Sequence, residues 1–172
     1  LIRRDWPRCA ARAAGSSTTH HDEMGMFFER LSGVVLDREV VMPSAVERAV
    51  GMCTAFGHPE AIGSPPVPVD CRGAEGCLFC EHFKVHADEH DTRKLISCRY
   101  CIQQTAPLAG SQERFLALFG PIFDRIGAIL SEVGKRAPGI VERLEREVVE
   151  DGNLDPYWAG KLEMLLNLEL VA

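Results

Sequence analysis

The feature that most constrains this chain is a cysteine-rich segment near its middle, where Cys77-Leu78-Phe79-Cys80 follows Gly76. Two cysteines separated by two residues on a tight turn can both reach one Zn²⁺ ion, which prefers four tetrahedral ligands. The chain has 7 cysteines, and this odd number fits poorly with a disulfide framework. The first residues also lack the apolar stretch of an export signal. We therefore expect a cytoplasmic protein in which a structural Zn²⁺ ion organises this segment.

Two sets of ligands can complete the zinc site. The local set joins the central pair to the nearest cysteine before it and a histidine after it: Cys71, Cys77, Cys80 and His86. The alternate set replaces the outer two ligands with Cys98 and Cys101. This gives two Cys-x-x-Cys pairs separated by seventeen residues, a spacing common in zinc sites. The pattern predicts zinc binding but leaves the choice between the two sets open.

The local set is preferred for two physical reasons. The stretch 86–104 is expected to form a helix, and its apolar stripe contains Leu95, Cys98, Cys101 and Ile102. Cysteines on such a stripe are usually core residues. Shorter loops also cost slightly less entropy to close. Against this preference, a helix can present thiolates at positions i and i+3 to one metal ion.

Outside the cysteine-rich segment, the plentiful Ala, Leu, Glu and Arg favour helix, so we expect a mainly α fold: a small helical domain with a zinc-stapled turn. The expected segments are an irregular lead-in at 1–20, a helical pair at 21–57, a Pro-rich linker at 58–70, and a zinc-binding turn plus helical bundle at 71–172. Within the pair, the first helix is expected from about residue 22. Ser44 and Glu47 form a capping box for the second, in which Cys53 is a small apolar core residue.

Three more helices are expected after the cysteine-rich segment. Ser111 caps the first, which Pro121 should kink or split. Pro138 opens the second at a first-turn position, and Asp155 followed by Pro156 opens the third. The side chains expected to pack around the zinc are Phe79, Phe83 and Leu95.

A different metal chemistry is suggested by His86-Ala87-Asp88-Glu89-His90, which matches the inverted zincin pattern His-x-x-Glu-His. On a helix, His86 and His90 would bind a catalytic zinc and Glu89 would act as the general base. The cysteines just upstream would compete for that metal and close the open position that catalysis needs. A zinc hydrolase is therefore a less favoured hypothesis than a structural zinc.

The charge pattern restricts the partners of the chain. A formal net charge of −6 argues against a protein that coats nucleic acid. Arg93, Lys94 and Arg99 can share one helix surface, which keeps a weak DNA contact as a hypothesis. No apolar run has the length of a membrane span, so no membrane partner is expected.

Several segments together match the pattern of a known family. They are Cys71-Arg72-Gly73, Gly76-Cys77-Leu78-Phe79-Cys80, His86-Ala87-Asp88, Arg93-Lys94-Leu95-Ile96-Ser97-Cys98-Arg99-Tyr100 and the closing run from Leu154 to Leu165. This pattern resembles the C-terminal tail of large tyrosine-type site-specific integrases from bacterial mobile elements. The stretch that begins at His21 is similar to the segment just after their catalytic domain.

The resemblance implies DNA integration or recombination, with DNA reached through the parent integrase and other integrase subunits as further partners. Such enzymes use a tyrosine nucleophile with Arg, Lys and His helpers. Tyr100 and Tyr157 both lie in the tail, and no His-x-x-Arg box precedes either, so no catalytic residue is assigned. We expect a non-catalytic zinc module that assists DNA binding or assembly. The alternative is a protein–protein interaction module without DNA contact.

Overall fold

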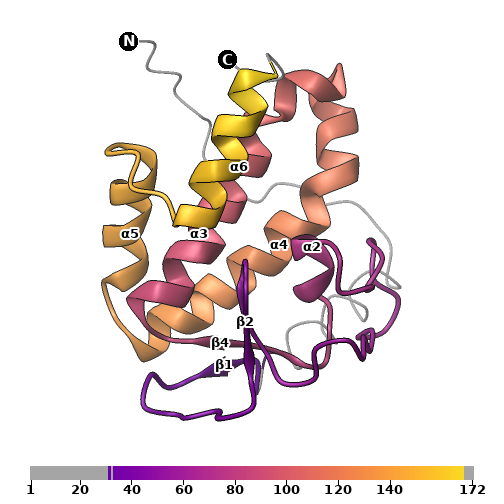
Figure 1. Cartoon of the computed structure of the whole chain (residues 1–172). Helices are drawn as coiled ribbons and strands as arrows, with labels where there is room; N and C mark the ends of the chain where they lie inside the picture. The colour runs from indigo at the N-terminus through magenta and orange to yellow at the C-terminus, as the bar shows by residue number, and fades with distance from the viewer. Residues whose placement is uncertain (1–30, 32, 169–172) are drawn as a thin grey trace, which may run out of the picture.

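The computed structural model describes residues 31 and 33–168, in which a group of helices stands on a small sheet (Figure 1). The elements are, in chain order, β1 (Val35–Leu36), β2 (Val46–Arg48), β3 (Gly51–Cys53), α2 (Ala74–Cys77), β4 (Phe83–His86), α3 (Glu89–Gln104), a 3₁₀ turn at Ala106–Ala109, α4 (Gln112–Arg136), α5 (Ile140–Val149) and α6 (Pro156–Asn167). More residues lie in helices than in strands, which confirms the expectation of a mainly helical chain.

The sheet has four strands in the order β1-β4-β3-β2. β1 is parallel to β4, whereas β4 and β3, and β3 and β2, are antiparallel. Gly51 of β3 packs directly on the backbone of β4. A Cβ atom at this residue would be 2.6 Å from the carbonyl oxygen of Lys84. Since β4 follows the Pro-rich stretch 58–70 and β1 and β3 precede it, both sides of that stretch contribute to one sheet.

The helix expected from Ser44 onward is wrong, because residues 46–53 form the β2–β3 hairpin. Tertiary contacts outweigh the local preference of the capping box for helix. Val50, at the turn, is fully buried, and the indole Nε1 of Trp158 on α6 donates a hydrogen bond to the Ala49 carbonyl at 2.7 Å. The lead-in at 1–20 and most of the helix expected from residue 22 lie outside the described residues. The end of that stretch is strand β1.

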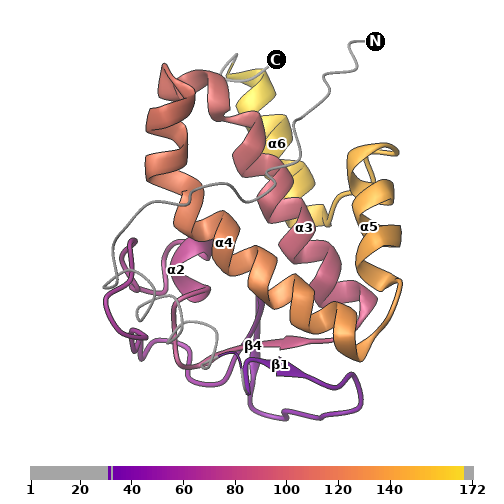
Figure 2. The same ribbon diagram turned by 180° about the vertical axis from the view of Figure 1, so that it is seen from behind.

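The central helix α3 contacts the sheet, α4, α5 and α6 (Figures 1 and 2). It begins at Glu89 because the Asp88 side chain accepts a hydrogen bond from the Asp91 N–H at 2.9 Å. The expectation of a helix over 86–104 is therefore wrong for its first residues, since His86 ends strand β4. The rest of the expected helix is confirmed.

The three later helices are also confirmed, but the expected place of Pro138 in the first turn of the second is wrong. α5 begins at Ile140, because Gly139 takes a left-handed φ of 81° at the N-cap, and Pro138 lies before it. Ser111 caps α4 by accepting from the Arg114 N–H at 3.2 Å, and Asp155 caps α6 by accepting from the Tyr157 N–H at 3.0 Å. Pro121 does not split α4, which runs through it for 25 residues. Among the described helices, none has the length and apolar character needed to cross a membrane.

Candidate metal centre

A small cavity of about 10 Å³ lies where the β2–β3 hairpin meets the cysteine-rich turn. Its wall contains four cysteines: Cys53, Cys71, Cys77 and Cys80. A space of this size holds one water molecule or one ion and excludes a substrate. The cavity is therefore suited to a structural site.

The four cysteines come from three separate segments of backbone. Cys53 is the last residue of β3, and Cys71 follows the Pro-rich stretch with a φ of 60°, a left-handed conformation that is uncommon outside glycine. Cys77 ends α2, and Cys80 forms an antiparallel bridge with Ala61. The cavity thus joins segments that share few hydrogen bonds of regular secondary structure.

The turn from Cys77 to Cys80 is fixed by short-range hydrogen bonds and by one glycine. The Phe79 N–H donates to the Gly76 carbonyl at 3.2 Å, and the Cys80 N–H donates to the Cys77 carbonyl at 3.1 Å. Gly76 is buried against the preceding stretch, where a Cβ atom would collide with the carbonyl oxygen of Pro68. The absence of a side chain at residue 76 lets α2 pack directly on this backbone.

Arg48 of β2 is the first of two cations at this turn. Its Nη2 donates to the Cys71 carbonyl at 3.0 Å, and its guanidinium lies 4.5 Å above the centre of the Phe56 ring. Burial raises the pKa of the Cys77 thiol, and the nearby Arg48 guanidinium offsets part of that shift. The nearby Cys53 and Cys71 thiols add to the rise in the pKa of Cys77, as expected for groups that share one cavity.

Arg125 of α4 is the second cation, and it is only 5% exposed. Its Nε donates to the Leu78 carbonyl, inside the Cys-x-x-Cys turn, at 2.9 Å. Its two terminal nitrogens are buried without a hydrogen-bond partner among the described residues. Burial lowers the pKa of Arg125, and the Glu81 carboxylate offsets part of this effect. A buried cation with open donors favours a negative charge nearby.

The structure brings together three of the four ligands of the local set and separates the fourth. His86 does not line the cavity. Its Nε2 lies 2.9 Å from the Val40 carbonyl oxygen and its Nδ1 lies 3.2 Å from the Asp91 carboxylate, so both ring nitrogens have partners. Sequence analysis missed Cys53, because it placed this residue in the core of a helix.

As the side chains stand, no three His, Cys, Asp or Glu groups within residues 31 and 33–168 converge into a ready-made metal site. The alternate pair does not line the cavity either. Cys98 is fully buried in α3, and burial raises its pKa well above the ordinary value. Cys101 donates from its Sγ to the Trp158 carbonyl at 3.4 Å, and burial raises its pKa to about 11. Both cysteines are buried core residues, as their place on the apolar stripe indicated.

The three residues of the hydrolase hypothesis also contact separate partners. His90 Nε2 lies 2.7 Å from the Glu47 carboxylate, whereas His86 contacts the Val40 carbonyl oxygen. The Glu89 carboxylate forms ion pairs at 2.8 Å with arginines on two helices, Arg93 and Arg143. This arrangement gives no support to a zinc held by the two histidines with Glu89 as base.

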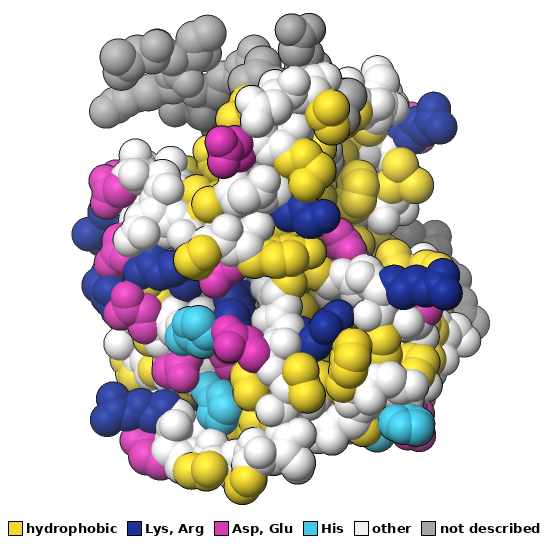
Figure 3. All heavy atoms as spheres, viewed as in Figure 1, with side chains coloured by type: hydrophobic (Ala, Val, Ile, Leu, Met, Phe, Trp, Pro, Cys, Tyr) yellow, Lys and Arg dark blue, Asp and Glu magenta, His cyan; other side chains and the backbone are white. Residues whose placement is uncertain are grey.

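The cations proposed for DNA contact are engaged by carboxylates. Their shortest ion pairs join Arg93 to Glu147 at 2.6 Å, Lys94 to Glu47 at 2.7 Å and Arg99 to Glu145 at 2.6 Å. In Figure 3, basic and acidic side chains alternate over the α5 side of the molecule, and they do not form a basic patch there. Binding of phosphate by these cations would first require these ion pairs to break.

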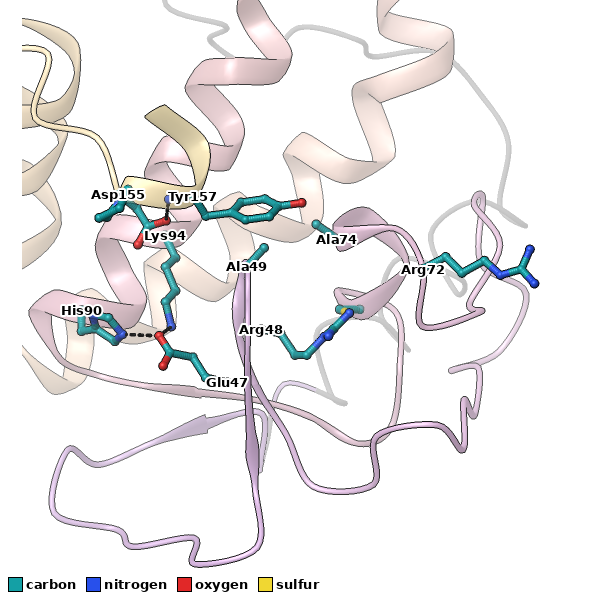
Figure 4. Close-up of a pocket in the computed structure, with 11 residues that line it drawn as sticks. Glu47, Arg48, Ala49, Arg72, Ala74, His90, Lys94, Asp155 and Tyr157 are labelled. Carbon is teal, nitrogen blue, oxygen red and sulfur yellow. Dashed lines mark hydrogen bonds and ion pairs between the residues drawn. The ribbon is translucent and has the colours of Figure 1, made fainter. Parts of the chain in front are cut away.

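An open hollow of about 430 Å³ lies beside the cysteine cavity, between β2, α2 and the start of α6 (Figure 4). His90 and Lys94 converge on Glu47 at one end, and the Tyr157 ring extends along one side. Arg48 and Cys77 line both the hollow and the cysteine cavity, so these two side chains form the wall between them.

Comparisons with protein-family models, with curated proteins and with solved structures gave no match.

Proposed function

We propose that this chain is a non-catalytic accessory module of a tyrosine-type DNA integrase. One structural Zn²⁺ ion holds the module together, and the module acts in the cytoplasm through assembly with integrase subunits. The observation that carries the proposal is that Cys71, Cys77 and Cys80, predicted as ligands from their spacing, line one small cavity. Zinc there would tie the Pro-rich stretch to the Cys77–Cys80 turn before β4.

Two properties of the site support a structural role for the metal. The cavity is too small to admit a substrate beside an ion. The segments around it are short, since α2 has 4 residues and β3 has 3, so they gain much of their order from whatever joins them. Structural zinc sites contribute folding energy directly, whereas a catalytic zinc keeps an open position.

The link to integrases is supported by where the matching segments lie. The run that contains Ser97 forms part of α3, and the closing run forms the cap and the body of α6. The two runs pack together: the Ser97 hydroxyl accepts a hydrogen bond from the Asp155 N–H at 2.9 Å, and Cys101, just after the first run, donates to the Trp158 carbonyl. These two runs therefore belong to one packed unit, which supports a shared module.

The ion pairs of Arg93, Lys94 and Arg99 favour assembly over direct DNA contact as the mode of action. These cations join α3 to α5 and to β2, and a net charge of −6 disfavours approach to a phosphate backbone. A protein–protein role is thus the form of the proposal that the charges support best.

Metal analysis of the full chain tests the zinc. Protein purified without added metal should contain one Zn²⁺ per chain, and a strong chelator should lower its Tm. A metal-free protein that is fully folded and indifferent to chelators would refute the zinc module.

Fluorescence anisotropy with a labelled DNA duplex tests the mode of action. We expect weak binding with little dependence on salt, and the same result for Arg93→Gln. Binding that weakens steeply with salt and is reduced by Arg93→Gln would show instead that the module contacts DNA.

A further inference from the structure

We propose that the fourth zinc ligand is Cys53, so that four thiolates hold the ion: Cys53, Cys71, Cys77 and Cys80. His86 then has no part in the site. This inference rests on the proposed structural zinc and names the ligand set of that same site.

The position of Cys53 is set by the sheet. It is buried at the end of β3 and faces Phe83 in the β3–β4 register, and both residues line the cavity. The next residue, Thr54, donates from its N–H to the His82 carbonyl at 3.0 Å, only two residues after Cys80. The backbones that carry the Cys53 and Cys80 thiols are thus joined.

Arg48, on the partner strand of the hairpin, ties Cys71 to β2. Its Nη2 donates to the Cys71 carbonyl at 3.0 Å, and the Cys77 carbonyl accepts a hydrogen bond from the Cys80 N–H at 3.1 Å. Every cysteine of the set is therefore linked to the hairpin through backbone hydrogen bonds or through Arg48. The thiols do not yet converge, but rotation about χ1 moves a Sγ atom between staggered positions without moving the backbone.

The geometry of β4 excludes His86. Strand residues alternate between the two faces of a sheet, and Phe83 and Val85 are buried whereas Lys84 and His86 are half-buried on the opposite face. His86 also lies three residues beyond Phe83, roughly 10 Å along the strand. A Zn–N bond is only about 2.0–2.1 Å long, so His86 would have to leave both of its present partners and the strand.

The positive charges at the cavity and at the adjacent Cys77–Cys80 turn match a four-thiolate site. Zn²⁺ with four thiolates carries a net charge of about −2, which must be compensated when it is buried. Arg48 and Arg125 supply two positive charges at the turn, and the terminal nitrogens of Arg125 are buried without a partner among the described residues. An anionic metal centre would add to the Glu81 carboxylate in compensating this buried cation.

X-ray absorption spectroscopy on the zinc-loaded full chain tests the ligand set without any substitution. Four sulfur neighbours at about 2.3 Å are expected, and a nitrogen neighbour at about 2.0–2.1 Å would overturn the assignment of Cys53. A protein without zinc would refute the proposed function itself, which keeps the two failures distinguishable. A chain whose mass shows a disulfide among these cysteines would refute both.

Variants give an independent test. We expect Cys53→Ser to lower zinc affinity at least tenfold, and the Co²⁺-substituted variant to lose part of its sulfur-to-cobalt charge-transfer absorption. His86→Ala is the matched control and should leave the zinc content and the Co²⁺ spectrum unchanged. Loss of metal in His86→Ala with retention in Cys53→Ser would overturn the inference. If Cys53→Ser does not fold, the absorption spectrum of the unmodified protein still decides.

Discussion

Replacement of Arg125 by methionine tests whether this buried cation is coupled to the proposed zinc. In the metal-free protein, the substitution removes a charged hydrogen bond to the Leu78 carbonyl, worth about 1.5–3 kcal/mol. It also removes terminal nitrogens that are buried without partners among the described residues, each costing about 1–3 kcal/mol. These contributions oppose each other: relief of the two nitrogens, worth at least about 2 kcal/mol, offsets a lost hydrogen bond worth at most about 3 kcal/mol. The free energy of unfolding of the metal-free protein should therefore fall by no more than about 1 kcal/mol.

The zinc-loaded protein should respond differently to the same substitution. Loss of a group that supports a metal ligand shell typically lowers metal affinity by about 10–100-fold. This corresponds to about 1.4–2.8 kcal/mol of binding free energy. Arg125→Met should therefore destabilise the zinc-loaded form by this amount relative to the metal-free form.

The assay combines urea unfolding of both forms with zinc affinity measured by competition with a chromophoric chelator. Arg136→Met is the matched control, because Arg136 lies on the same helix but pairs with Asp37 and Glu132 at the surface. It should leave zinc affinity unchanged. The reasoning is refuted if Arg125→Met binds zinc as tightly as the unmodified protein does, or if it loses stability equally in both forms.

Three further predictions concern the surroundings of the site. Gly76→Ala should destabilise the protein by about 1–3 kcal/mol in urea unfolding, because the new methyl group collides with the Pro68 carbonyl; an unchanged midpoint would contradict this close packing. Cys101, with a pKa of about 11, is ionised to about one part in a thousand at pH 8. In the native protein it should therefore resist iodoacetamide, as followed by mass spectrometry, and rapid labelling would show that the core is open. The pKa of Glu147 is lowered chiefly by its hydrogen bond to Arg93, so this stabilisation is complete above the unfolded pKa and disappears as the pH falls through the folded pKa. The difference in stability between the unmodified protein and Glu147→Gln should thus be constant above about pH 5 and should vanish at lower pH; a difference that persists at low pH would exclude this cause.

Helix ends were the most predictable part of the fold, because their signals act within one turn of backbone. Ser111 and Asp155 each cap a helix with their own side chain, as their positions in the sequence indicated. The same kind of local signal was misleading at Ser44. There the capping box competes with strand pairing and with burial of Val50, both of which depend on residues far along the chain.

The candidate site likewise has residues that local sequence indicates and residues that only long-range contacts place. The spacing of Cys71, Cys77 and Cys80 indicated a shared cavity, because all three lie within ten residues of one another. Cys53 and His86 could not be assigned from the sequence, because their roles depend on how β4 pairs with its two neighbouring strands. The register with β3 places Cys53 opposite Phe83 at the cavity, whereas His86 pairs with Leu36 of β1 and contacts Val40 and Asp91.

The sequence by itself thus determined the mainly helical character, the caps of the later helices and the thiol-rich turn, since each depends on neighbours a few residues away. Only the tertiary structure decided that 46–53 is a hairpin, that Cys53 joins the cysteine cavity and that Arg125 reaches the turn from α4. The physical reason is that strand pairing and the burial of a charge are settled between segments remote in sequence, where local propensity carries no information.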